Sequence, residues 1–135
     1  MDIKESLHRI LEQKKAVSEL FYQVFLNSCP EARSFFEKTN MSLQAMNLSI
    51  ALILIERFHH VSYGAVEEWL KCLGSKHQDW GVPLELYQPF REALLETLKQ
   101  HHGPDWGAEV EDQWRTAIDR ASQVMGVGYQ QRFHV

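Results

Sequence analysis

The stretch that decides the fold runs from Val66 to Val82 and reads V-E-E-W-L-K-C-L-G-S-K-H-Q-D-W-G-V. At helical spacing, positions i, i+4, i+7 and i+11 form one stripe, which consists of Val66, Leu70, Leu73 and His77. The last member of this apolar stripe is an imidazole, and the W-G-V-P that follows breaks the pattern. Three interpretations stay open from this segment alone: a core histidine bonded to a backbone carbonyl, a surface residue on a last turn, or a metal or haem ligand.

The composition is that of one globular domain. Of the 135 residues, 44% are hydrophobic and 24% are charged, so we expect a real core and no global disorder. The net charge of -4 and the scattered basic residues indicate neither nucleic acid nor a membrane surface as a partner. Two cysteines form at most one bridge, so we expect reduced thiols and a cytoplasmic protein.

The N-terminal part predicts three helices. Asp2 followed by Glu5 resembles a capping box and opens the first helix. A second helix follows to about Asn27, with Tyr22 beside its apolar face. Pro30 suits the first turn of a short third helix.

A longer helix is expected over residues 43–59, with Asn40 or Ser42 as its N-cap. Its run over 50–55 has the composition of a buried strand and is far too short to span a bilayer. The apolar pattern extends in both directions, which favours a helix buried on most sides. Its stripe at i, i+4, i+7 and i+11 again contains one polar residue and consists of Gln44, Leu48, Ala51 and Ile55.

The C-terminal part predicts two more helices. Pro83 opens the first, and Asp105 is a candidate cap for the second. The G-V-G segment over 126–128 is expected to end the last helix, so we expect a domain over 1–126 and a tail or linker over 127–135. No segment predicts a convincing strand, and the expected architecture is all-α with roughly seven helices.

Signatures of common enzymes are absent from the sequence: there is no G-x-G-x-x-G, phosphate loop, H-E-x-x-H or C-x-x-C. Glu5 with His8, and Glu56 with His59, form two Glu-x-x-His segments of the kind that di-iron bundles use together with two further glutamates. Because Glu5 and His8 lie on the polar side of the first helix, solvated surface residues are the favoured interpretation, with a di-iron centre as a distant alternative.

A haem site needs an apolar slot, a neutral imidazole on one side and a suitably polar opposite side. His77 ends one apolar stripe, Gln44 begins another, and Tyr22 lies among the aromatic residues of the second helix. Each of these residues alone has an ordinary structural explanation. Together they supply one ligand and two hydrogen-bond donors within an otherwise apolar set.

Over about residues 3 to 125 the sequence resembles the globin family. The segments that carry the resemblance are, in order, F-Y-Q-V-F (21–25), Pro30 with Phe36 six residues later, L-G-S-K-H (73–77), W-G-V-P (80–83), Y-x-x-F-x-E-A-L-L (87–95) and W-x-x-A…S-Q-V-M (114–125). They are most similar to the bacterial three-over-three class of single-domain haemoglobins and haem sensors. The resemblance implies a three-over-three helical sandwich. The sequence departs from the family pattern in a shortened first helix and in a longer segment between Gln44 and His77, for which two alternatives stay open: an extended connection, or two helices that run together.

The resemblance implies haem b as the cofactor and His77 as its proximal iron ligand, with the Leu73 carbonyl accepting a hydrogen bond from the other ring nitrogen. Tyr22 and Gln44 match the two distal positions that can donate hydrogen bonds to O2, although an alternative register places Leu43 in the position of Gln44. The haem contacts that the resemblance implies are Phe36, Leu48, Leu73, Val82, Tyr87 and Phe90.

The function implied by the resemblance is reversible binding of O2, and of NO and CO, by an O2 binder or a gas-sensing domain. In flavohaemoglobin-like relatives a tyrosine and a glutamate hold the proximal histidine. Tyr87 matches the tyrosine, but Tyr129 stands where the glutamate is expected. Because this glutamate is missing, NO dioxygenation with an external reductase is the weaker alternative. As partners, a second copy of the chain in a homodimer or a signalling domain is compatible with the short first helix and the tail.

Overall fold

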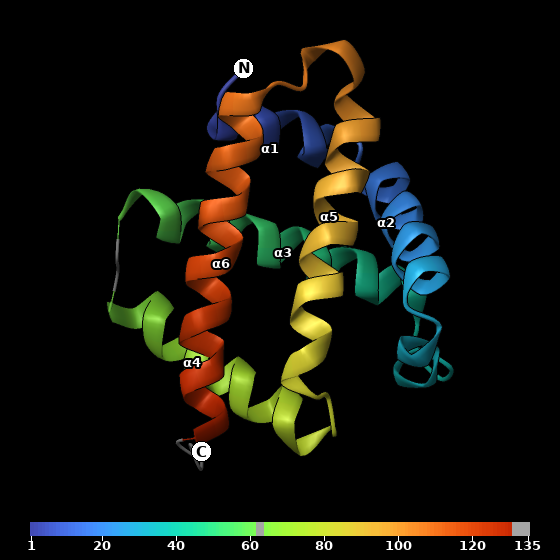
Figure 1. The fold of residues 1–135 in the computed structure, drawn as a ribbon, viewed down its shortest axis with the longest axis vertical. Coiled ribbons are helices and arrows are strands. Elements are labelled where there is room, and N and C mark those ends of the chain that lie inside the picture. The colour runs from blue at the N-terminus through green and yellow to red at the C-terminus, as the bar shows by residue number, and fades with distance from the viewer. Residues whose placement is uncertain (62–63, 131–135) are drawn as a thin grey trace.

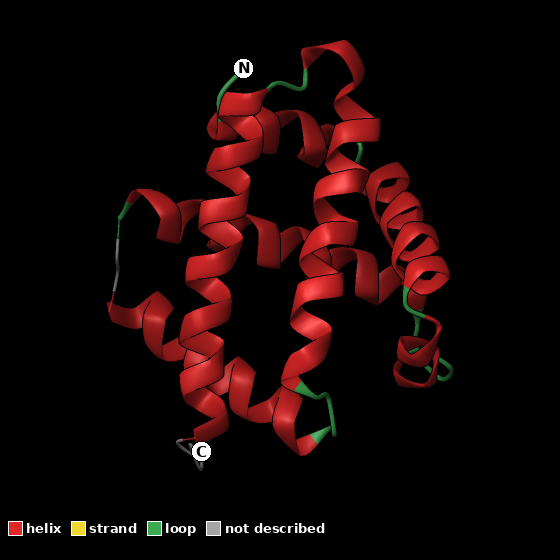
Figure 2. Ribbon diagram, in the orientation of Figure 1, coloured by secondary structure: helices red, strands yellow, loops and turns green. Residues whose placement is uncertain are grey.

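The structure is a computed structural model that describes residues 1–61 and 64–130. Within this part the chain forms six α-helices, three short 3₁₀ helices and no strand (Figure 2). The all-α architecture is therefore confirmed. Residues 62–63, which follow the helix predicted over 43–59, and the end of the predicted tail beyond residue 130 lie outside the described residues.

The helices follow one another with short connections. The α-helices are α1 (Ile3–Glu12), α2 (Lys14–Ser28), α3 (Met41–His60), α4 (Gly64–Asp79), α5 (Tyr87–His102) and α6 (Ala108–Gln130), and the 3₁₀ helices are η1 (Pro30–Phe35), η2 (Leu84–Leu86) and η3 (Gly103–Asp105). In Figure 1, α5 and α6 run along the long axis, α2 packs beside α5, and α3 and α4 cross behind α6 at different heights. This arrangement places α3 and α4 on the same side of α6, where each of them packs against it.

Local capping chemistry explains where two of the helices begin. The Asp2 side chain accepts a hydrogen bond of 2.9 Å from the backbone N–H of Glu5, as predicted for the start of α1. The Asn40 side chain accepts from the backbone N–H groups of Ser42 and Leu43 at 3.0 and 3.2 Å. Asn40 is therefore the cap of α3, and the helix begins at Met41.

The core lies where α1, α2, α3, α5 and α6 meet. Its largest side chains with almost no exposed surface are Trp114, Phe21, Ile3, Ile10, Leu52, Leu94, Leu98 and Ile118. Aromatic rings add specific geometry, because Phe90 of α5 meets Phe21 and Phe25 of α2 edge to face, with ring centroids 5.1 and 5.7 Å apart. These contacts fix the start of α5 against α2.

One buried polar cluster joins α1, α5 and α6. The indole N–H of Trp114 donates to the Ser6 hydroxyl at 2.9 Å, and the same hydroxyl lies 2.7 Å from Nε2 of His102. A buried indole normally has such a partner, because an unpaired N–H away from water is costly. Burial is the main reason why the pKa of His102 falls from 6.5 to about 4.

The prediction that the helix over 43–59 is buried on most sides is wrong. The side chains of Leu43, Met46 and Ile50, at i, i+3 and i+7 of one face of α3, are 57%, 55% and 42% exposed. The opposite face, which contains Leu48 and Leu52, packs against α1, α2 and α6. Among the described helices, α3 alone is long and apolar enough to cross a membrane. Core helices that do not enter a membrane meet the same criteria of length and composition.

The last helix does not end at the G-V-G segment, as the sequence predicted, but continues through Gly126 and Gly128 to Gln130. Gly128 faces the backbone of α4, where a Cβ atom would lie 2.9 Å from the carbonyl carbon of Lys71. This glycine therefore permits a close helix crossing instead of ending the helix. The boundary between a domain over 1–126 and a tail stays a prediction, with residues 127–130 belonging to α6.

The predicted cap of the last helix is also wrong. Asp105 ends η3, and α6 begins three residues later at Ala108. The Asp105 carboxylate instead accepts a hydrogen bond of 2.8 Å from the guanidinium of Arg9 in α1. Asp105 therefore ties the turn before α6 to α1.

Candidate functional site

His77 lies on the last turn of α4, and its ring orientation is fixed by its own helix. Its Nδ1 is 2.8 Å from the carbonyl oxygen of Leu73, one turn earlier, so the predicted hydrogen bond is present. With Nδ1–H as the donor, the lone pair of the neutral ring lies on Nε2. Burial lowers the pKa of His77 and outweighs the opposing effect of the Leu73 carbonyl. The imidazole is therefore neutral at neutral pH, which is the form that binds a metal.

The segment after α4 is also held in place. The backbone N–H of Val82 donates to the carbonyl oxygen of His77 at 2.9 Å. The hydroxyl of Tyr129, near the end of α6, donates to the Val82 carbonyl oxygen at 2.7 Å. The ring of Trp80, which is 62% exposed, lies 5.3 Å from the His77 ring. Fixed backbone on both sides of His77 limits how far the imidazole can move.

Two tyrosines, Tyr87 and Tyr129, lie near His77. The resemblance to flavohaemoglobin-like relatives predicts a tyrosine and a glutamate at these positions. The ring centroids of Tyr87 and Tyr129 are 5.9 Å apart, and Tyr87 is 6.4 Å from His77. The Tyr87 hydroxyl is buried without a well-formed hydrogen bond to any described residue. Burial, and then the neighbouring Tyr129 hydroxyl, raise its pKa far above the ordinary value, so the phenol stays neutral. Within the described residues, His77 thus has a backbone carbonyl and no carboxylate as its hydrogen-bond partner.

Tyr22 lies on α2 among aromatic rings and is only 6% exposed. Its ring meets Phe21 and Phe36 edge to face, at centroid distances of 4.9 and 5.3 Å. Burial raises the pKa of Tyr22 to about 12, and the Gln44 side chain, close enough to interact with the hydroxyl, partly opposes this rise. Gln44 is half-buried on the first turn of α3, whereas Leu43 faces solvent. The structure therefore turns Gln44, and not Leu43, toward Tyr22.

The other residues that the resemblance implies as haem contacts are mostly half-buried and apolar. Leu48 on α3 is buried, and Phe36, Leu73, Val82, Tyr87 and Phe90 are all partly exposed. Partly uncovered apolar side chains are the residue types that a haem would cover. The donor set and its apolar surroundings fit a haem with one histidine ligand.

The site residues form two groups on different helices. Tyr22, Phe36 and Gln44 belong to α2, the segment after η1, and α3, whereas His77 and Tyr87 belong to α4 and α5. No hydrogen bond or ring contact between described residues joins the two groups directly. This separation suits the opposite walls of a slot.

The structure connects further residues with the site. Trp80 follows His77 by three positions in the sequence, so the helical spacing itself could have revealed their contact. The bond from Tyr129 to Val82 joins residues 47 positions apart, and no local pattern announces it. The same holds for the crossing of α4 and α6 at Gly74 and Gly128.

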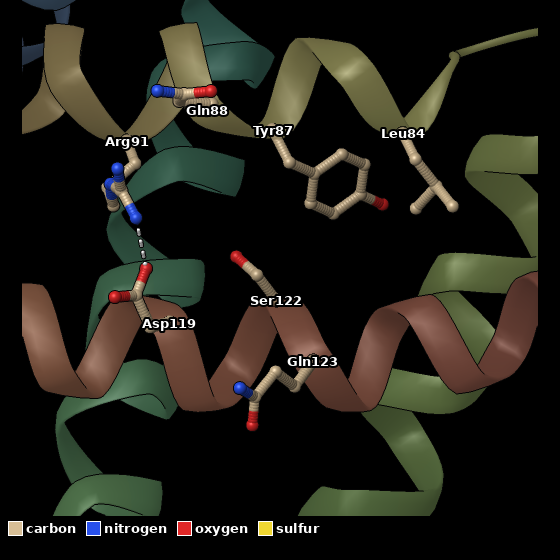
Figure 3. A pocket seen from close by; sticks show the side chains of 7 residues that line it. All are labelled: Leu84, Tyr87, Gln88, Arg91, Asp119, Ser122 and Gln123. Atoms are coloured by element: carbon tan, nitrogen blue, oxygen red, sulfur yellow. Dashed lines mark hydrogen bonds and ion pairs between the residues drawn. The ribbon is translucent and has the colours of Figure 1, made fainter.

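A separate groove of about 440 Å³ is lined by residues of η2, α5 and α6 (Figure 3). Its lining consists of Leu84, Tyr87, Gln88, Arg91, Asp119, Ser122 and Gln123. The guanidinium of Arg91 donates to the Asp119 carboxylate at 2.8 Å across the groove, so these two side chains form an ion pair. Only Tyr87 is shared with the residues expected to contact haem, so the groove is not the site predicted from the sequence.

The two Glu-x-x-His segments do not form a metal site. The carboxylate of Glu5 pairs with Arg9 at 2.9 Å, and that of Glu56 pairs with His60 at 3.0 Å. No three or more His, Cys, Asp or Glu side chains in the described part of the chain are grouped so that they could hold a metal ion. The residues present therefore do not fit a carboxylate-bridged di-iron centre.

Comparisons with known proteins bear on nearly the whole chain. A family model described as globin matches residues 5–125. A leghaemoglobin from Sesbania rostrata is 32% identical over 115 residues, which cover 78% of each chain. An anaerobic nitrite reductase from Solanum lycopersicum is 24% identical over 136 residues, covering 91% of this chain and 87% of the relative. A Pseudomonas aeruginosa protein, described as structurally highly homologous to a human haemoglobin, superposes with a TM-score of 0.79 at 24% identity and covers 95% of this chain and 98% of its own.

Proposed function

The chain belongs to the globin family and has an all-α globin fold, and we propose that it holds haem b on His77 and reversibly binds O2 there. NO and CO are proposed as further ligands of the same site. The role is that of an O2 binder or of a gas-sensing domain. The relatives support haem and oxygen binding at the level of the family.

The observation that carries this proposal is the state of His77. Its Nδ1 is committed to the Leu73 carbonyl, so Nε2 is left as the coordinating atom. Burial keeps the ring neutral at neutral pH, so no proton has to leave before coordination. Haem, when bound, supplies a ferrous iron that coordinates O2 reversibly.

The distal residues of this chain would slow the release of O2. The Tyr22 hydroxyl keeps its proton at neutral pH, because burial raises its pKa to about 12, and it can therefore donate a hydrogen bond. The side-chain amide of Gln44 is the second donor. Hydrogen bonds of this kind are stronger in a buried, apolar site than in water.

NO dioxygenation with an external reductase is the weaker candidate. A histidine that donates to a carboxylate becomes a more electron-rich ligand than one that donates to a backbone carbonyl. His77 has the carbonyl of Leu73 as its partner, and Tyr87 is kept neutral. These contacts favour reversible binding over oxidative chemistry.

Absorption spectroscopy of the purified protein tests the proposal. We expect an intense Soret band that is lost in His77→Ala and retained in the control His60→Ala, which changes a half-exposed histidine at the end of α3. A wild-type protein without a Soret band after haem addition would contradict haem binding. An unchanged band in His77→Ala, without added imidazole, would contradict the ligand assignment.

A further inference from the structure

The helix that presents His77 touches α6 backbone to backbone at two glycines. A Cβ atom on Gly74 would lie 2.7 Å from the carbonyl carbon of Met125, and one on Gly128 would lie 2.9 Å from that of Lys71. Both distances are shorter than real Cβ contacts, and the obstacles are backbone atoms that cannot rotate away. The crossing is reciprocal, because each glycine receives a carbonyl group from the other helix.

This crossing lies one helical turn from the proximal histidine. Gly74 precedes His77 by three residues and follows Leu73, whose carbonyl accepts the hydrogen bond from the imidazole. Helix α4 packs mainly against α6 and only slightly against α3. The position of α6 therefore determines where α4, and with it His77, lies.

A second contact from α6 holds the segment that follows His77 in the sequence. Tyr129, the neighbour of Gly128, donates its hydroxyl to the Val82 carbonyl oxygen at 2.7 Å. The N–H of the same Val82 donates to the carbonyl of His77 at 2.9 Å. The last turns of α6 thus hold the chain before His77 through the glycines and after it through the tyrosine.

We propose that the Gly74–Gly128 crossing is a positioning element for the proximal histidine. By letting α4 and α6 approach to backbone distance, the two glycines set the place of the imidazole, which with haem bound would determine the strain on the coordination of iron by His77. A methyl group at position 128 forces α4 away from α6 and carries His77 with it. This inference rests on the proposed haem ligation by His77.

The test compares Gly128→Ala with Gly126→Ala, a matched control in the same helix where an added Cβ would meet nothing within 4 Å. The first measurement is the iron–histidine stretching band in the resonance Raman spectrum of the ferrous protein. The second is the rate of haem transfer to excess apomyoglobin. We expect Gly128→Ala to shift the band and to lose haem about tenfold faster, as overpacking at a rigid contact predicts, while Gly126→Ala matches the wild type.

A variant with a milder effect covers the case in which Gly128→Ala does not fold, as judged by far-UV circular dichroism. Tyr129→Phe keeps the ring against Tyr87 and removes the hydrogen bond to Val82. We expect a smaller shift of the same band. If every variant that folds, whether Gly128→Ala and Tyr129→Phe or Tyr129→Phe alone, keeps the wild-type band and haem-transfer rate, the crossing serves the fold alone and the proposal is overturned. A wild-type protein without a Soret band would overturn haem binding itself, and this inference with it.

Discussion

Acidification should weaken the fold through one buried imidazole, that of His102. The residue is 7% exposed, and its Nε2 shares the Ser6 hydroxyl with the indole of Trp114. Its ring stacks on Trp106, with centroids 5.9 Å apart and planes within 5°. Burial is the main cause of the fall of its pKa to about 4; the positive charges of nearby His101 and Arg9 add to it, and Asp105 opposes it.

The magnitude follows from the two pKa values of the same group. The unfolded chain protonates His102 below about pH 6.5, whereas the folded chain does so only below about pH 4. Between these values the unfolded state binds more protons, so the stability due to the neutral imidazole is complete above pH 6.5 and is lost as the pH falls. One pKa unit corresponds to about 1.4 kcal/mol, so the full loss approaches about 3 kcal/mol, of which about 2 kcal/mol falls between pH 7 and pH 4.5.

Urea unfolding at pH 7 and at pH 4.5, followed by far-UV circular dichroism, measures this loss. His102→Gln keeps a hydrogen-bonding side chain beside Ser6 but does not titrate. We expect the variant to lose about 2 kcal/mol less than the wild type between the two pH values. Release of haem in acid is common to both proteins and largely cancels in the difference. His8→Gln, which changes a side chain that is 77% exposed, is the control for removal of a histidine.

An equal loss of unfolding free energy in the wild type and in His102→Gln would refute this reasoning. It would mean that the cluster opens to water or accepts a proton without cost. The pH dependence would then arise at other groups, and the buried contact of Ser6 with His102 would not act as a neutral pair.

Three further results are expected. Tyr22→Phe should speed O2 release about five- to thirtyfold, as loss of one hydrogen bond worth about 1–2 kcal/mol predicts, whereas Leu43→Ala, at an exposed position, should leave the rate unchanged. Stopped-flow ligand replacement measures both rates. Equal rates for Tyr22→Phe and the wild type would show that Tyr22 does not donate to O2. Asn40→Ala should cost about 1 kcal/mol of unfolding free energy, because two N–H groups at the start of α3 lose their acceptor; an unchanged urea midpoint would contradict the cap. Ser6→Ala should cost about 1–3 kcal/mol, because the buried indole N–H of Trp114 loses its partner, and a neutral effect in the same assay would show that water replaces the hydroxyl.

The sequence predicted the features that depend on neighbours along the chain. The Asp2 cap of α1 and the hydrogen bond between His77 and Leu73 both join residues within one helical turn, so spacing and side-chain chemistry suffice to foresee them. The order of the helices follows from the same apolar periodicity. The likeness to globins placed Tyr22 and Gln44 near one another, which no local rule could do.

The predictions that were wrong concern features that depend on which residues of other helices pack against a given helix face. Apolar composition predicted that α3 would be buried on most sides, but composition does not say which faces have neighbours, and Leu43 and Met46 keep more than half of their surface exposed, at 57% and 55%. Gly128 is equally suited to end a helix and to admit another backbone, and only the position of Lys71 in α4 decides between them. Such ambiguities are resolved by tertiary packing and not by propensity.

The two walls of the proposed haem site, the distal wall with Tyr22 and the proximal wall with His77, are held in place by different helices. Tyr22 is buried in the aromatic cluster of α2, so the distal wall is part of the core. His77 lies on a helix that is held mainly by α6, through Gly128 and through the bond from Tyr129 to Val82. Substitutions at the distal donors should therefore change O2 release without moving a helix. A change along the last turns of α6, by contrast, should reach His77, the proposed iron ligand, through the backbone contacts of Gly128 and through the bond from Tyr129 to Val82.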